Sequence, residues 1–312
     1  RLVSDWSSDV CSSDLGRPES SDALILDTTP LADLGDFDSG DGENFARFLA
    51  WGARSFPARN YVLALASHGA GWEGIITDYS TGNILSLPEL RQALTTAQQA
   101  ASIDRFALLI NDACLMASVE YHTVMREAFD FSLASPEIVV NPALDMTLFA
   151  QSVKDSPTEI DLPNLGRLLI NTYMQRDVAQ RRASDKEFLT NALVDLNRFQ
   201  SVEEAVEAFA AVINENPELH AAMLGAARQS AYVYTGFLDQ NTLIDLGSFM
   251  REVVKRSSDV RVLEAAQIVL RALQASLVYS EAGERASRRI AHSYHNIYFP
   301  QIVLEKSSTL IQ

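Results

Sequence analysis

The sequence predicts an α/β protein in which a mostly parallel sheet is flanked by helices. Two uninterrupted apolar runs have the length of strands, residues 61–66 (YVLALA) and 106–110 (FALLI), and residues 131–134 (FSLA) are predicted to form another short strand. Stretches with helical spacing of apolar residues separate these runs. Strands that are apolar on both faces and alternate with helices are typical of a parallel sheet covered on both sides.

The other elements have signals of their own. Ser86 can cap a helix over residues 86–101, with Pro88 in its first turn, and Pro57 ends a helix over 43–56. Further helices are predicted over residues 118–129, 162–174, 202–213, 220–231, 243–256 and 260–277. Further strands are predicted over residues 23–27, 189–196 and 295–300. The chain beyond Pro142 is therefore expected to be largely helical.

Length and charge restrict the class of protein. The chain has 312 residues, enough to bury a sizeable core, and a formal net charge of −16. Nucleic acid and anionic membranes repel an acidic surface, so neither is expected as a partner. No apolar run approaches the roughly 18 residues that span a bilayer, so we expect no membrane insertion.

His68 and Cys114 each lie just beyond the end of a predicted strand. Functional residues of parallel sheets cluster at the carboxyl ends of the strands, so the two side chains are expected in one crevice. A thiol attacks a carbonyl as the thiolate and needs a base nearby, which an imidazole supplies. Small neighbours leave backbone N–H groups accessible, so the amides of Gly69 and Cys114 are candidates for an oxyanion hole. A purely structural role for either residue stays open at this point.

The remaining histidines show no metal-ligand spacing, and we predict no metal site. His122 falls on the helix after Cys114, and His220 opens another helix. His292 and His295 form a loose pair without neighbouring acids or cysteines. We expect each of these four to be structural or exposed.

Two segments resemble motifs of the clostripain family of cysteine peptidases. Residues 61–72 (YVLALASHGAGW) resemble the family's strand followed by His-Gly-x-Gly-Trp. Residues 111–120 (NDACLMASVE) resemble its Asp-x-Cys-Leu-Met-x-x-x-Glu motif. Residues 87–94 resemble the connecting helix, and residues 134–137 and 297–300 resemble later strand ends.

The resemblance implies a caspase-like fold, with Cys114 as nucleophile and His68 as general acid and base. It implies cleavage of proteins or peptides after arginine or lysine, with Asp112 binding the basic side chain; a helix N-cap is the alternative for Asp112. Asp145 is a candidate for a second acid in that pocket. By family analogy the protein is expected to be secreted or at the cell surface, although the chain carries no signal peptide.

The resemblance also divides the chain. Residues 1–15 repeat the triplet SSD and have no apolar periodicity, so we interpret them, with Cys11, as a non-native, adapter-like tail, a native disordered tail being the alternative. Residues 16–200 are predicted to form the caspase-like catalytic region, and residues 201–312 a helical region packed on it. The family's first strand or strands would precede Ala23, and we expect them to be missing from this sequence.

Some features leave other functions open. The family has a Gly-rich, Trp-containing stretch where residues 139–149 read VVNPALDMTLF, so one wall of the cleft is expected to differ. The chain could therefore be an inactive peptide-binding module with a peptidase fold, or a related cysteine peptidase of different specificity. No cofactor is expected to be required. Calcium, which some family members need, could bind the acids of the loop 36–41 together with Asp78.

Overall fold

The computed structural model describes residues 34–35, 37–140, 143–155, 160–175, 189–234, 242–283 and 293–300. Within these residues the mixed α/β architecture predicted from the sequence is confirmed. The strand predicted over residues 23–27 and the tail 1–15 lie outside them.

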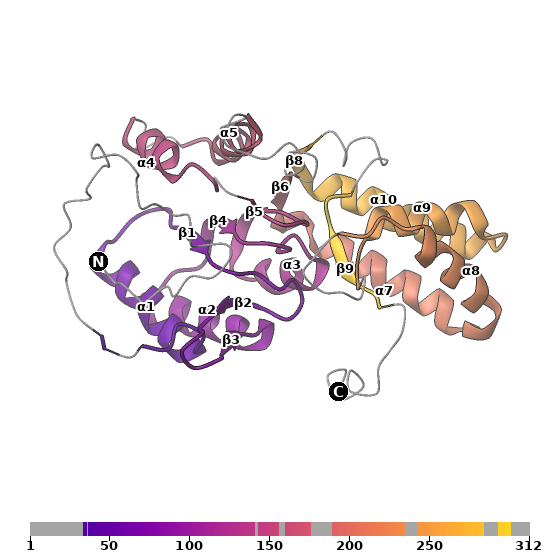
Figure 1. Ribbon diagram of the computed structural model, residues 1–312, viewed down its shortest axis with the longest axis horizontal. Coiled ribbons are helices and arrows are strands. Elements are labelled where there is room, and N and C mark those ends of the chain that lie inside the picture. The colour runs from indigo at the N-terminus through magenta and orange to yellow at the C-terminus, as the bar shows by residue number, and fades with distance from the viewer. Residues whose placement is uncertain are drawn as a thin grey trace.

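A five-stranded sheet forms the centre of the molecule (Figure 1). Its strands are β1 (Val62–Ala66), β4 (Phe106–Asp112), β5 (Phe129–Ala134), β6 (Thr190–Asp195) and β8 (Leu277–Ala282), in the order β1-β4-β5-β6-β8. The first three are parallel, whereas β6 and β8 are antiparallel to their neighbours. Because β1, β4 and β5 run in the same direction, the loops that follow them meet at one edge of the sheet.

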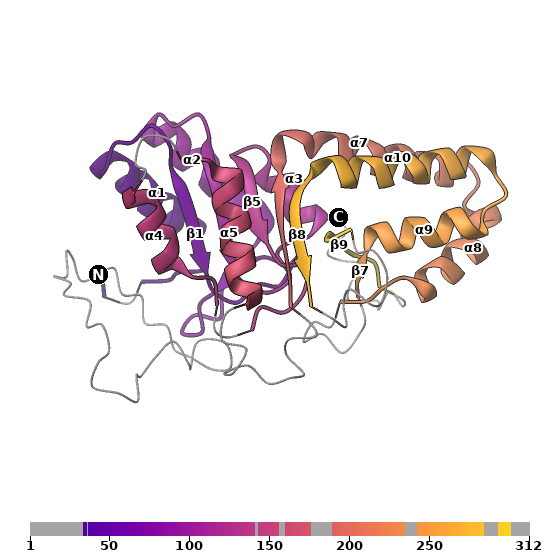
Figure 2. The same ribbon diagram turned by 90° about the horizontal axis from the view of Figure 1, so that it is seen from above.

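Helices cover both faces of this sheet (Figures 1 and 2). One face carries α1 (Gly42–Ser55), α2 (Leu87–Ala101) and α3 (Val119–Met125), and the other carries α4 (Met146–Asp155) and α5 (Leu162–Gln175). Ser86 is the N-cap of α2 as predicted, and it forms a reciprocal pair with Glu89, three residues later. Helix α4 was not predicted.

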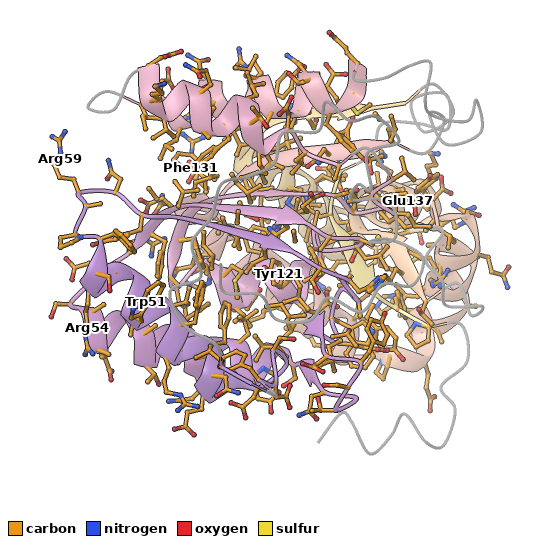
Figure 3. All side chains as sticks on the ribbon, turned by 60° about the vertical axis from the view of Figure 1, so that its left-hand side comes forward. Trp51, Arg54, Arg59, Tyr121, Phe131 and Glu137 are labelled. Carbon is orange, nitrogen blue, oxygen red and sulfur yellow. The ribbon has the colours of Figure 1, made fainter. Side chains whose placement is uncertain are left out.

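The two faces bury separate apolar clusters, as expected for a sheet covered on both sides. Tyr121 belongs to the larger cluster, under α1–α3, and Phe131 packs against the smaller one, under α4 and α5. Figure 3 shows these two side chains on opposite faces of the sheet. The strands that carry the site are therefore fixed from both sides.

The chain after β6 is largely helical, as predicted. It contains the short 3₁₀ helix η1 (Leu196–Arg198), then α7 (Gln200–Asn214), α8 (Pro217–Ser230), α9 (Leu246–Arg256) and α10 (Val260–Ser276). These helices extend beyond the β8 edge of the sheet (Figure 1). In the described part of the chain, no helix is both long and apolar enough to cross a membrane.

Two short antiparallel pairs of strands complete the described structure. Strands β2 (Ile75–Thr77) and β3 (Ile84–Leu85) are antiparallel and lie between β1 and α2 in the chain. Strands β7 (Leu243–Asp245) and β9 (Asn296–Tyr298) are also antiparallel and join two distant parts of the C-terminal region.

Three predicted boundaries were wrong for identifiable reasons. The helix predicted over 118–129 ends at Met125, because Phe129 pairs with Phe106 and starts β5. The helix predicted over 243–256 begins only at Leu246, because Asp245 is its N-cap and the preceding residues pair with β9. The pattern over 260–277 ends at Ser276, and the unpredicted strand β8 follows, so the C-terminal region contributes a strand to the central sheet.

Candidate functional site

The loops that follow β1 and β4 lie side by side. In this parallel pair Ala66 is opposite Asp112, and the Ser67 amide donates a hydrogen bond of 3.3 Å to the Asp112 carbonyl oxygen. His68 and Cys114 each follow this matched pair by two residues. The register of one pair of strands therefore brings the two candidate catalytic loops together.

Gly69 shows how closely these loops pack. A Cβ atom built on Gly69 would lie 2.2 Å from the carbonyl oxygen of Cys114 and 2.7 Å from Sδ of Met116. Both distances are far inside van der Waals contact, so no side chain fits at this position. The absence of a Cβ atom is what allows the histidine loop to reach the cysteine loop.

Cys114 is a free thiol, and only 4% of the residue is exposed. The amide of Val139 donates a hydrogen bond to its Sγ at 3.3 Å, and the Val139 carbonyl oxygen lies 3.9 Å from the same atom. Ile138 and Trp72 complete the apolar surroundings of the thiol. The segment that follows β5 thus lies against the sulfur atom in this structure.

The imidazole of His68 contacts an aromatic ring that the sequence analysis did not single out. The ring of Tyr79 meets it edge-on, with ring centroids 5.7 Å apart and an interplanar angle of 90°. Tyr79 lies in the turn between β2 and β3, and the Ile76 amide of β2 donates a hydrogen bond to the His68 carbonyl. The carboxylate of Asp78 accepts hydrogen bonds from the amide and hydroxyl of Ser39, which ties this turn to the loop before α1.

Asp112, two residues before Cys114, is mostly buried at the end of β4. Burial raises the pKa of its carboxyl group to about 6, and a hydrogen bond from the Leu144 amide opposes the shift. Among the described residues, its Oδ1 atom is buried and has no hydrogen-bond partner. The helix N-cap role considered as its alternative belongs instead to Ser118, whose hydroxyl accepts the Tyr121 amide at the start of α3. The carboxylate of Asp112 is therefore able to receive another hydrogen-bond donor.

Asp145 directly follows the residue whose amide contacts Asp112, so the two acids lie on neighbouring segments of the structure. Its Oδ1 atom accepts the Leu148 amide at 3.0 Å and so caps the first turn of α4.

The carboxylates proposed to bind calcium already accept hydrogen bonds from the protein. Asp38 accepts the Gly40 amide, Asp41 caps α1 through the Asn44 amide, and Asp78 accepts from Ser39 as described above. Hydrogen bonds from the Ser80 hydroxyl and from Ser39 hold the pKa of Asp78 well below its usual range. Asp36 lies outside the described residues, and within them no three metal-ligating side chains come together.

Two of the remaining histidines form a buried pair. His122 and His295 are both fully buried, with ring centroids 5.7 Å apart. Burial lowers the pKa of both, and the proximity of His295 lowers that of His122 further. His220 is also buried, whereas His292, the expected partner of His295, lies outside the described residues.

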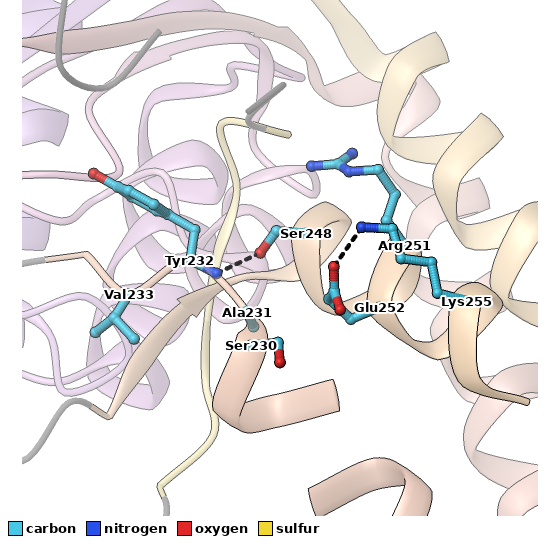
Figure 4. Close-up of a pocket in the computed structure, with 8 residues that line it drawn as sticks. All are labelled: Ser230, Ala231, Tyr232, Val233, Ser248, Arg251, Glu252 and Lys255. Carbon is cyan, nitrogen blue, oxygen red and sulfur yellow. Dashed lines mark hydrogen bonds and ion pairs between the residues drawn. The ribbon is translucent and has the colours of Figure 1, made fainter. Parts of the chain in front are cut away.

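A separate cavity lies in the helical region (Figure 4). It has a volume of about 300 Å³ and lies between the end of α8 and one side of α9, with Arg251, Glu252 and Lys255 among its lining residues. Its charges are balanced internally, because Lys255 pairs with Glu252 and Arg251 with the buried Asp245. Nothing in this lining favours a ligand of particular charge.

Sequence reasoning missed Tyr79 as a neighbour of His68 and Val139 as a neighbour of Cys114. Neither belongs to a motif, and Val139 reaches Cys114 from 25 residues away. The departure from the family pattern at residues 139–149 was the one available signal, because that stretch includes the residue that covers the thiol.

Several solved structures have a similar fold. An inactive zymogen C11 protease from Parabacteroides distasonis matches with a TM-score of 0.65 and 15% identity, over 90% of this chain and 76% of that one. A secreted C11 cysteine protease from Bacteroides thetaiotaomicron, bound to an irreversible peptide inhibitor, matches with a TM-score of 0.60 and 16% identity, over 86% of this chain and 73% of that one. A clostripain from the same organism, bound to the peptide inhibitor BTN-VLTK-AOMK, matches with a TM-score of 0.51 and 14% identity, over 76% of this chain and 95% of that one.

At these identities the structural matches establish the fold, which is the caspase-like fold that the resemblance implied. None of the curated proteins compared with the chain gave a match. The model of the clostripain family matches residues 19–311, nearly the whole chain and both candidate loops. The chain belongs to the clostripain family of cysteine peptidases.

Proposed function

We propose that this protein is a cysteine endopeptidase that cleaves proteins or peptides after arginine or lysine, with Cys114 and His68 as its dyad. The observation that carries the proposal is the packing of the two motif loops, which leaves no room for a side chain at Gly69 beside Cys114. A purely structural cysteine would not require the histidine loop to approach so closely.

The proposed reaction uses groups that these two loops supply. His68 accepts the proton of the Cys114 thiol, and the thiolate attacks the carbonyl carbon of the scissile peptide bond. The amides of Gly69 and Cys114 donate hydrogen bonds to the resulting oxyanion. His68 then protonates the leaving amine, which gives an acyl-enzyme, and water attacks this thioester to release the acid and restore the thiol.

The proposed specificity rests on Asp112. Its carboxyl group is mostly buried, two residues before the nucleophile, and its Oδ1 atom has no hydrogen-bond partner among the described residues. An arginine or lysine side chain would supply both the missing donor and an opposite charge. Asp145, on the adjoining segment, is proposed as a secondary contributor. The inhibitor bound to the Bacteroides thetaiotaomicron clostripain, BTN-VLTK-AOMK, has a lysine next to its AOMK group, which is consistent with this specificity.

The state of the thiol favours a second candidate function. Because Val139 covers Cys114, a form that binds peptides without cutting them is also supported. We prefer a latent peptidase, in which substrate or processing displaces the segment around Val139; one structural neighbour is itself an inactive zymogen. A secreted location is proposed by analogy with the secreted neighbour, and a calcium requirement is left to the assay below.

The test uses two fluorogenic peptides, one ending in arginine and one in asparagine, with Cys114→Ala as the inactive control and with calcium or a chelator present. Cleavage after arginine that is lost in Cys114→Ala, and strongly reduced in Asp112→Asn, is the expected result. Cleavage only after asparagine would refute the specificity. Binding of the arginine peptide by a folded protein that never cuts it would support the binding module instead.

A further inference from the structure

The residue after the candidate nucleophile has an unusual backbone conformation. Leu115 has a φ of +66°, in the left-handed region that leucine rarely adopts. Such conformations are unfavourable and persist only where the surrounding structure holds them. The position of Cys114 therefore depends on contacts that keep this turn in place.

Part of the support comes from the loop that follows β5. The Leu115 amide donates a hydrogen bond of 3.1 Å to the Glu137 carbonyl, and the Ala117 amide donates one of 3.0 Å to the Ser135 carbonyl. These bonds join the loops after two neighbouring strands, but they leave the carbonyl groups of the cysteine turn to be satisfied from elsewhere.

Asn296, on β9, provides the remaining support. Its side-chain Nδ2 donates hydrogen bonds of 3.0 Å to both the Leu115 carbonyl and the Pro136 carbonyl, across 181 and 160 residues of sequence. Its backbone amide donates a further bond of 2.9 Å to the Ala117 carbonyl. The side chain is fully buried, and its two carbonyl contacts require the NH₂ end of the amide, so its orientation is determined by its partners.

We propose that Asn296 is a positioning residue for Cys114, and that its amide clamps the nucleophile turn against the loop that follows β5. The inference rests on the proposed function, because it assigns a role in that reaction. It makes the reactivity of the thiol depend on the C-terminal strand β9, although no residue of that strand belongs to the dyad.

The clamp has a defined consequence for catalysis. Without the two donors of Asn296, the Leu115 carbonyl is free and the turn can relax from its positive φ. A displacement of about 1 Å at a reacting group can lower the rate about 100-fold. Asp112 precedes the turn, and its carboxylate contacts Leu144 rather than Asn296, so substrate binding should change little.

The experiment compares Asn296→Ala with Asn191→Ala. Asn191 is an equally buried asparagine on β6, and its Oδ1 atom accepts a hydrogen bond from the neighbouring Ala192 amide. We expect Asn296→Ala to lower kcat about 100-fold with KM nearly unchanged, and Asn191→Ala to retain kcat at comparable stability in urea. Equal losses of kcat in the two variants would mean that Asn296 has only a structural role.

A second background tests the mechanism itself. Glycine adopts a positive φ without cost, so Leu115→Gly should make the turn less dependent on the clamp. In the Leu115→Gly background, Asn296→Ala should then lower kcat only about 10-fold, compared with about 100-fold in the wild-type chain. The same loss in both backgrounds would overturn the clamp.

A chemical readout keeps this proposal separate from the peptidase assignment. Alkylation of Cys114 by iodoacetamide, followed over pH by mass spectrometry of its peptide, needs no substrate and resolves it from Cys11. Asn296→Ala should shift the alkylation profile of Cys114 away from that of wild type, and Asn191→Ala should not. A shift in a protein that cleaves no peptide would refute the proposed function alone, whereas identical profiles in wild type and Asn296→Ala would refute the positioning role.

Discussion

Gly69 has no room for a side chain, and Gly69→Ala should damage both the fold and the dyad. The added Cβ atom would lie 2.2 Å from the Cys114 carbonyl oxygen, a backbone atom that cannot rotate away. Ordinary contact is roughly 3.5 Å, so the two loops would have to separate by more than about 1 Å.

The magnitude follows from that separation. Overpacking of this kind typically costs about 1–3 kcal/mol of stability. The same displacement at the reacting groups should lower kcat/KM about 100-fold or more. Stability would be measured by urea unfolding, and activity with the arginine peptide.

The matched control is Gly225→Ala in the interior of α8. A Cβ atom at Gly225 would meet nothing within 4 Å, so alanine should stabilise the helix by about 0.5–1 kcal/mol and leave activity unchanged. If Gly69→Ala kept wild-type stability and activity, the inferred contact between the two loops would be wrong. Loss of activity with unchanged stability would instead mean that the added Cβ atom displaces the reacting groups without destabilising the fold.

Three further predictions concern the ionisable and aromatic groups. Burial raises the pKa of Asp112 from 3.8 to about 6, so the buried carboxyl group destabilises the fold once it ionises as the pH rises through 6. Asp112→Asn should therefore be more stable than wild type at pH 8, by up to about 3 kcal/mol in urea unfolding. Equal stability of the two proteins would contradict the burial argument. The edge-on contact of the Tyr79 ring should orient the His68 imidazole, so Tyr79→Ala should lower kcat about 3- to 10-fold whereas Tyr79→Phe should retain it. An equal loss of kcat in both variants would show that the Tyr79 hydroxyl, and not the ring, supports the reaction. Burial lowers the pKa of His122 and His295 below 6.5, so stability should fall as the pH drops below that value, and His122→Gln should weaken this dependence. An unchanged pH dependence of urea unfolding in His122→Gln would show that burial does not lower the pKa of His122.

The sheet and the proximity of the loops that carry His68 and Cys114 could be predicted from sequence because their signals are local. Residues 61–66 and 106–110 are apolar runs of strand length, and His68 and Cys114 follow them at fixed offsets. The second run is buried on both faces in β4, whereas Ala64 and Ala66 of β1 are exposed. When two parallel strands are neighbours in a sheet, their carboxyl ends lie at the same edge. The loops that carry His68 and Cys114 are therefore expected to lie close together. The cap at Ser86 was predictable for the same reason, since both of its partners lie within one helical turn.

The features that only the tertiary structure decided involve contacts between distant segments. The sequence shows Asp112 as an acid near a cysteine, but its burial in the folded chain is what raises its pKa. Strand β8 follows α10 without a break in the pattern, and it is a strand because β6 offers it an open edge. Asn296 is one polar residue in a short apolar strand, and its two carbonyl partners lie 160 and 181 residues away. Burial, edge pairing and long-range hydrogen bonds depend on where the whole chain folds, so no local pattern encodes them.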